Sequence, residues 1–150
     1  TENIPILGAL VVLGQEISFK KDSMHSFQHR LRQAWKTAHA NAILLRSTTM
    51  SHGARIRLLQ ALVKPSLLYG AETWKLTPAL LAKIIGAERA FSRWCMRLTN
   101  RSGTTGEEER DIEAWVQWQA ESARQLAKTT HKQQIERWHV TALRLHWKWA

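Results

Sequence analysis

Apolar residues recur at intervals of three and four along most of this 150-residue chain. That interval places side chains on one face of an α-helix, so it restricts the chain to a fold built from packed amphipathic helices. The first run predicts a helix of about six turns that begins after Asp22 and Ser23, either of which can cap it. Its apolar stripe consists of Met24, Phe27, Leu31, Ala34, Trp35, Ala38, Ala42 and Leu45.

Two more helices are predicted before residue 100. Ser51 can cap a helix that is bent or ended near Pro65, because proline lacks the N–H that a helix interior needs. Thr77 and Pro78 form an N-cap with proline at the first helical position, and they open a third helix. The two apolar stripes are Ile56, Leu59, Leu62 and Val63, and then Leu80, Leu81, Ile84, Ala87, Phe91, Trp94, Cys95 and Leu98.

The two ends of the chain have different patterns. Residues 1–22 are rich in β-branched and apolar side chains, and two glycines there would weaken a helix, so they predict a short β element. The small polar run at 99–106 predicts a linker. Residues 107–150 predict a helical pair, in which acidic residues open the first helix and the second begins near Lys132.

We therefore expect a mostly α fold in three parts. A short N-terminal β element occupies residues 1–22, a three-helix bundle occupies 23–100, and a C-terminal helical pair occupies 107–150. The last helix is apolar on two faces, one of which carries Val140, Leu143 and Trp147, and such a helix needs two partners. We expect one partner to lie outside this chain, which we interpret as a piece of a longer protein.

The net charge is +10, and the first 100 residues carry nearly all of it, with 14 Lys and Arg against 5 Asp and Glu. A positive field of this size attracts polyanions, although a basic protein without a polyanion partner is the alternative. The longest uncharged apolar run is too short to cross a bilayer, so no membrane partner is expected. The single cysteine, Cys95, excludes an internal disulfide and fits a reducing compartment.

Few residues of this sequence suggest catalysis. Its two aspartates are far apart, and no phosphate-binding glycine loop is present. Cys95 lies on an apolar stripe and is interpreted as a packed thiol. His25 and His29 stand one helical turn apart, but no obvious third ligand accompanies them, so no metal site is predicted. We expect this chain alone not to be an enzyme.

The basic residues form two helical ridges. His25, His29, Arg32, Lys36 and His39 share one stripe, and Arg89, Arg93 and Arg97 follow at intervals of four. Like charges at this interval destabilise a helix slightly, which favours a role in contacting phosphates over a merely solvated face, the alternative. Six of the eight tryptophans fall on or beside apolar stripes and are predicted to pack in the core: Trp35, Trp74, Trp94, Trp115, Trp138 and Trp149. Trp118 and Trp147 are predicted to be free for a ligand or a neighbouring domain.

Residues 65–77, PSLLYGAETWKLT, resemble the segment that follows the palm in reverse transcriptases of non-LTR (LINE-type) retrotransposons. Other segments match this family in the same order. Val12-Leu13-Gly14 is similar to its primer-grip hairpin, RLRQAW at 30–35 to the helix after it, and RIRLLQALV at 55–63 to the helix before the proline. ERAFSRWCMRL at 88–98 resembles its arginine-rich helix, and HWKWA at 146–150 resembles a later block.

The family's polymerase aspartates are absent from this chain, so the resemblance implies the end of the palm, the thumb and a connection region without catalytic activity. The two Mg²⁺ ions of the polymerase would belong to an upstream palm in the same protein, and no cofactor is expected here. The implied function is to hold an RNA–DNA hybrid, or RNA, by its shape and backbone. The implied setting is intracellular, in the nucleus and cytoplasm, as part of a retroelement ribonucleoprotein.

Residue roles follow from the same resemblance. The expected phosphate contacts are Arg32, Lys36, Arg89, Arg93 and Arg97, and Gly14 is expected near the primer strand. Four residues of the 65–77 segment are expected to be architectural: Tyr69, Gly70, which would allow a turn, Glu72, which could bind backbone amides or an arginine, and Trp74. Two alternatives stay open: a helical protein-interaction module derived from a retroelement, and a decayed reading frame without function.

Overall fold

A computed structural model describes residues 9–12, 15–18, 23–98 and 108–149 of the chain. Most of these residues are helical, as predicted. The helices are α1 (Ser23–Ala40), α2 (Ala42–Leu45), α3 (His52–Leu68), α4 (Pro78–Met96), α5 (Glu108–Lys132) and α6 (Trp138–Trp149). A short 3₁₀ helix, η1 (Ala71–Thr73), lies between α3 and α4.

Two short strands precede the helices. β1 (Ala9–Val12) and β2 (Gln15–Ser18) pair antiparallel, with Ala9 opposite Ser18 and Val12 opposite Gln15. Both lie inside the segment 1–22, whose other residues, Gly14 among them, are outside the described part of the chain. The expected primer-grip role of this segment and of Gly14 therefore stays a prediction.

The predicted helix starts at Ser51 and Thr77 are confirmed by their hydrogen bonds. The Ser51 hydroxyl accepts a hydrogen bond from the N–H of Ala54 at 3.2 Å, and the Thr77 hydroxyl accepts one from the N–H of Leu80 at 3.2 Å. Each side chain satisfies one of the N–H groups that the first turn of a helix leaves without a partner. These caps fix where α3 and α4 begin.

Two predicted helix boundaries are wrong. The run from 24 to 45 is two helices, because Asn41 leaves the helical conformation and its side-chain amide donates to the Thr37 carbonyl at 2.9 Å, in competition with the backbone. α3, which was predicted to be bent or ended near Pro65, contains this proline and continues to Leu68. The last helix begins at Trp138 and not near Lys132, because α5 runs to Lys132 and the backbone then turns through Gln134, at φ 52°.

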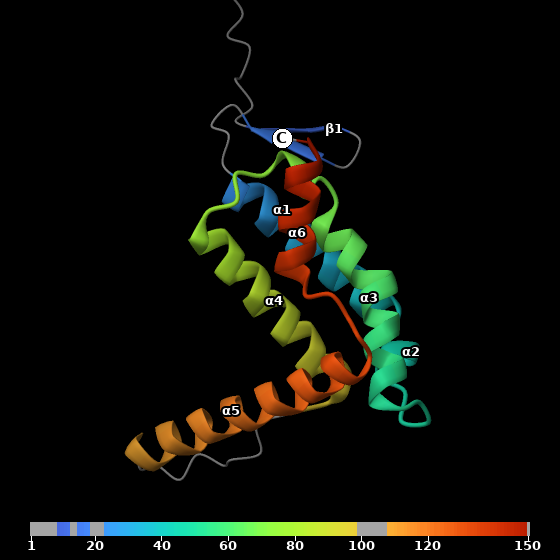
Figure 1. Cartoon of the computed structure of the whole chain (residues 1–150), viewed down its shortest axis with the longest axis vertical. Helices are drawn as coiled ribbons and strands as arrows, with labels where there is room; N and C mark the ends of the chain where they lie inside the picture. The colour runs from blue at the N-terminus through green and yellow to red at the C-terminus, as the bar shows by residue number, and fades with distance from the viewer. Residues whose placement is uncertain (1–8, 13–14, 19–22, 99–107, 150) are drawn as a thin grey trace, which may run out of the picture.

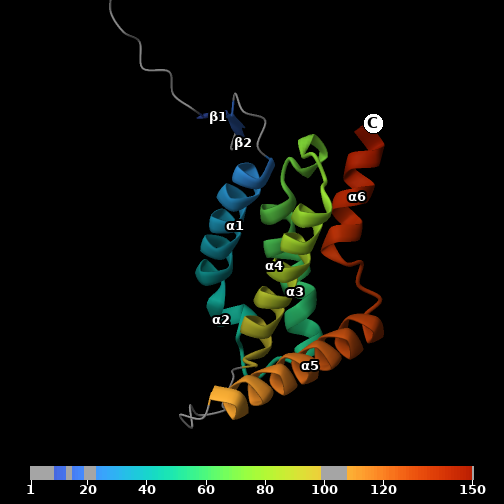
Figure 2. The same cartoon turned by 90° about the vertical axis from the view of Figure 1, so that its left-hand side faces the viewer.

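Helices α1, α3, α4 and α6 pack side by side as a bundle, and α5 crosses one end of it (Figures 1 and 2). α6 lies beyond the predicted linker but packs against η1 and α4, so it contributes to the same core as the helices before residue 98. The largest buried apolar side chains come from all four bundle helices, the loop after η1 and α2: Phe27, Leu45, Ile56, Leu59, Leu67, Trp74, Leu80, Ile84, Phe91 and Trp138.

Candidate nucleic-acid interface

Two cations of α1 lie on the side of the helix away from its buried face. Phe27, Ala34 and Ala38 pack into the core, whereas Arg32 and Lys36 are exposed. The interval of four residues places these two cations one turn apart on the same side of the helix, as predicted from the spacing. No carboxylate is present anywhere in the α1 sequence, SMHSFQHRLRQAWKTAHA, so no residue of α1 itself can neutralise this side.

An aromatic cluster joins α1 to α4 next to these cations. The His39 ring stacks on Trp35 at a centroid distance of 5.6 Å and meets the edge of Trp94 at 5.3 Å. Trp35 also contacts Phe91 at 4.0 Å and Trp94 at 5.8 Å. His39 is exposed, and both tryptophans are half-buried. The cluster therefore packs α1 on α4. Its exposed part lies between the predicted basic ridges of these two helices.

Arg97 extends this surface on α4. It is the C-cap of the helix, in the left-handed conformation at φ 58°, and its N–H bonds the carbonyls of Arg93 and Trp94. Its side chain is exposed, within one helical turn of Trp94. We define the α1–α4 face as the two cations of α1, the exposed edge of the aromatic cluster and this arginine: Arg32, Lys36, His39, Trp94 and Arg97.

Arg93, the middle member of the predicted α4 ridge, points toward α5. Its guanidinium donates a hydrogen bond to Gln119 Oε1 at 2.7 Å and lies 5.1 Å from the centre of the Trp118 ring. Burial, followed by repulsion from Arg89, lowers the pKa of Arg93. Arg93 thus holds α5 against α4, and Trp118 is half-buried beneath it instead of free. The phosphate contact expected of Arg93 stays a prediction.

Arg89 is exposed and lines a groove between α4 and α5 together with Arg93. The structure therefore divides the predicted α4 ridge in two. Arg97 joins the α1–α4 face, whereas Arg89 and Arg93 face α5. The spacing of the three arginines could not reveal this division, because it depends on where α5 packs.

The predicted architectural residues surround the turn between α3 and η1. Gly70 adopts the left-handed conformation at φ 78°, which a glycine allows without steric cost. Trp74 is 2% exposed and meets Phe27 edge to face at 6.0 Å. Tyr69 is exposed, with the Arg30 guanidinium 4.3 Å above its ring, and Glu72 lies in η1. The contacts expected of Glu72 stay predictions.

Three further residues have positions that bear on chemistry. Cys95 is buried, its thiol donates to the Leu45 carbonyl at 2.9 Å, and burial raises its pKa to about 11, as suits the packed thiol that was predicted. Buried Arg55 donates to the Cys95 carbonyl at 2.8 Å. Glu88 is 1% exposed and paired with Arg137 at 2.9 Å. The sequence did carry a signal for Glu88, which stands four residues after Ile84 on the apolar stripe.

Some of the predictions for the tryptophans are confirmed and some are wrong. Trp74 and Trp138 are core residues, and Trp35 and Trp94 pack partly buried against the core, as predicted. Trp147 is 73% exposed, also as predicted. Trp115 was expected in the core but is 51% exposed, because the part of α5 that carries it extends past the bundle (Figure 1).

Within the described residues, no group of three His, Cys, Asp or Glu side chains is placed to hold a metal ion. None of the described helices is both long enough and apolar enough to span a bilayer. The chain matches no family model, no curated protein and no solved structure. The function of this chain is therefore inferred from its own residues.

Proposed function

We propose that the chain is the non-catalytic thumb and C-terminal segment of a non-LTR retrotransposon reverse transcriptase. In this proposal it grips the RNA–DNA template–primer duplex through the α1–α4 face. The polymerase aspartates and their Mg²⁺ ions would belong to a palm upstream in the same protein. The setting would be a retroelement ribonucleoprotein in the nucleus and cytoplasm. The sequence resemblance at residues 65–77 supports the choice of family.

The observation that carries the proposal is the charge of the α1–α4 face. α1 contains no carboxylate, and the only carboxylate of α4, Glu88, is buried and paired with Arg137. The exposed cations of both helices thus have no carboxylate on their own helices. Cations arranged in this way favour phosphates, and each phosphate they neutralise releases counterions from the nucleic acid.

The aromatic cluster suits a duplex as well. Its rings are packed against one another, with His39 at the exposed edge, so they present a firm surface between the cations of α1 and Arg97. A hybrid duplex is recognised by its shape and backbone, which requires a rigid surface with cations at its margins. No base-specific contact is needed, so we expect weak sequence preference.

The test is the salt dependence of binding to a labelled RNA–DNA hybrid, followed by fluorescence anisotropy. A triple variant replaces the exposed cations of the α1–α4 face by glutamine: Arg32→Gln, Lys36→Gln and Arg97→Gln. We expect the slope of log affinity against log salt to become shallower by roughly two to three units, at about 0.9 per phosphate contact. Arg93 is left unchanged, since its loss would disturb the packing of α5.

A charge-matched triple variant is the control. It replaces exposed cations outside the α1–α4 face, one on α3 and two on α5: Arg57→Gln, Arg124→Gln and Lys128→Gln. Its slope should change by less than one unit. Circular dichroism should show that both variants keep their helix content, because all six side chains are exposed. Equal changes in the two variants would mean that total charge alone attracts the duplex, and the proposed face would be wrong.

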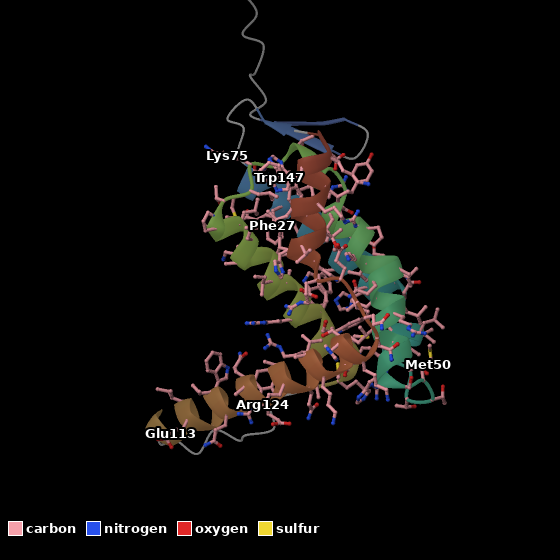
Figure 3. The ribbon with its side chains drawn as sticks, in the orientation of Figure 1. Phe27, Met50, Lys75, Glu113, Arg124 and Trp147 are labelled. Carbon is pink, nitrogen blue, oxygen red and sulfur yellow. The ribbon has the colours of Figure 1, made fainter. Side chains whose placement is uncertain are left out.

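A helical protein-interaction module is the second candidate. The observation that favours it is the exposed apolar side of α6, where Val140 is 41% and Trp147 is 73% exposed. Trp147 lies at the end of the bundle away from α5 (Figure 3), so a partner could dock there without reaching the α1–α4 face. An unchanged salt slope in a folded triple variant would favour this candidate.

A further inference from the structure

A groove of about 220 Å³ lies between α4 and α5. Its α4 side presents the guanidinium groups of Arg89 and Arg93, and its α5 side presents Gln119, Ser122 and small apolar side chains. Among the described residues, no carboxylate lines it. Arg93 is bound to Gln119, whereas the described part of the chain places no hydrogen-bond or ion-pair partner on Arg89. Two cations thus face one groove, and an anion would relieve their repulsion.

The first half of α5 extends beyond the bundle next to this groove. We call residues 112–117 the overhang; Figure 1 shows this end of α5 lying past the other helices, and Figure 3 places Glu113 near its tip. Ile112, Trp115 and Val116 are each more than half exposed. Trp115 stands four residues before Gln119, so the two side chains lie on the same side of α5, and Trp115 lies one helical turn beyond the residues that line the groove.

We infer that this groove, together with the exposed ring of Trp115 in the overhang, binds single-stranded nucleic acid. Arg89 and Arg93 hold a phosphate of the strand, and one unpaired base stacks on the exposed ring of Trp115. Basic grooves with aromatic side chains at their margins bind single strands in this way, because every base has a face that can stack on an aromatic ring. A duplex has no unpaired base to stack on Trp115, because its bases are already stacked on one another.

The composition of the groove favours a strand over a protein segment. The groove wall carries two arginines, and one of them, Arg89, has no partner in the described part of the chain, so the groove favours an occupant with anionic groups. A strand supplies both a phosphate for the arginines and a flat ring for Trp115. The inference uses none of the α1–α4 face residues, so it stands or fails independently of duplex binding.

The test measures binding of the full 150-residue chain to a fluorescein-labelled ten-nucleotide oligo(dT) by anisotropy. Trp115→Ala should weaken binding roughly tenfold, as expected for the loss of one stacked base, whereas Trp115→Phe should retain most of the affinity. Arg89→Gln should make the salt dependence shallower by about 0.7, the value for one phosphate of a single strand. Helix content should stay unchanged, because both side chains are exposed.

Three controls separate base stacking, phosphate binding and duplex binding. Ile112→Ala removes a side chain of similar exposure from the same overhang and should leave oligo(dT) binding unchanged. An abasic oligonucleotide of equal length should bind more weakly than oligo(dT). It should also be insensitive to Trp115→Ala while still responding to Arg89→Gln. The α1–α4 triple variant should bind oligo(dT) normally, even if the hybrid experiment fails.

The remaining outcomes contradict the inference. Equal losses in Trp115→Ala, Trp115→Phe and Ile112→Ala would identify an apolar docking surface and not a stacking site. Equal affinity for oligo(dT) and the abasic strand in every variant would mean that charge alone holds the strand. No measurable binding of oligo(dT) at low salt would overturn the inference outright.

Discussion

A tryptophan of the bundle is buried, whereas a similar tryptophan in the overhang of α5 is exposed. Trp138 of the bundle is fully buried, contacts Phe91 and donates its indole N–H to Gln60 at 2.9 Å. Trp115 of the overhang has the same kind of apolar neighbours along its helix, yet half of its surface is exposed. The difference is that Trp138 lies inside the core of the bundle, whereas the overhang extends past the bundle (Figure 1).

Buried and exposed positions both occur along the apolar stripe of α5. Leu126 and Ser122, in its second half, are buried where α5 crosses the end of α3 and α4. The same stripe continues toward the N-terminal end of α5, where its apolar residues are exposed: Ile112, Trp115 and Val116. An apolar stripe thus identifies the side of a helix that can be buried, but the neighbouring elements decide how much of it is. Exposed apolar side chains grouped in this way are typical of binding surfaces.

The largest loss of stability that tests this comparison is expected from replacing Trp138. Trp138→Ala should lower the free energy of unfolding by about 3–5 kcal/mol, because it leaves a cavity in the core and removes the partner of Gln60. Trp115→Ala, the matched change in the overhang, should cost less than about 0.5 kcal/mol. Urea denaturation followed by circular dichroism measures both. Similar losses in the two variants would mean that the overhang is packed against something in solution.

A smaller effect is expected from two ion pairs, one buried in the bundle and one exposed on α5. Glu88 is 1% exposed and receives both bonds of Arg137 at 2.9 and 3.0 Å. Arg137→Ala should cost about 2 kcal/mol, since it leaves a buried carboxylate unpaired, although Arg137 itself is partly exposed. Arg124→Ala breaks an exposed pair with Glu121 at 3.9 Å and should cost less than about 0.5 kcal/mol.

The same urea measurement checks this second comparison. A double variant, Glu88→Leu with Arg137→Met, should recover much of the stability that Arg137→Ala loses, because no buried charge is left. If Arg137→Ala costs no more than Arg124→Ala, the Glu88 pair is open to solvent and does not belong to the core.

The helices could be predicted from the sequence because their signals are local. The hydroxyls of Ser51 and Thr77 bond to backbone groups three residues away, and the spacing of three and four needs only the chain itself. The break at Asn41 was missed because the apolar stripe continues across it, and only the side chain of Asn41 competes with the helix.

The candidate site could be predicted only in part, because it depends on contacts distant in sequence. The exposure of Arg32 and Lys36 follows from their place off the apolar stripe of α1. The turn of Arg93 toward Gln119 depends on how α5 crosses α4, which helical spacing does not contain. The exposure of Trp115 was missed for the same reason: its spacing is that of a core residue, but no described element covers it.

The smallest expected effect lies where α5 meets the bundle. Glu136, between α5 and α6, accepts hydrogen bonds from Arg144 at 3.0 and 3.2 Å and from Thr141 at 2.7 Å. The Lys64 ammonium of α3 lies 4.0 Å from its carboxylate. These hydrogen bonds, with that of Arg144 the strongest influence, lower the pKa of Glu136 to about 2.

This lowered pKa predicts a pH-dependent contribution to stability. Because the folded chain binds the proton of Glu136 less readily than the unfolded chain does, the interaction stabilises the fold above the ordinary pKa of 4.5 and is lost as the pH falls toward 2. Glu136→Gln should therefore reduce stability above pH 5 and converge with the unmodified chain near pH 2. The difference should stay below about 1 kcal/mol, because solvent screens this exposed group. Thermal melts from pH 2 to 7 measure this difference in stability, with Glu121→Gln as the exposed control. A difference that stays constant across that range would assign the effect to the shape of the side chain and not to its charge.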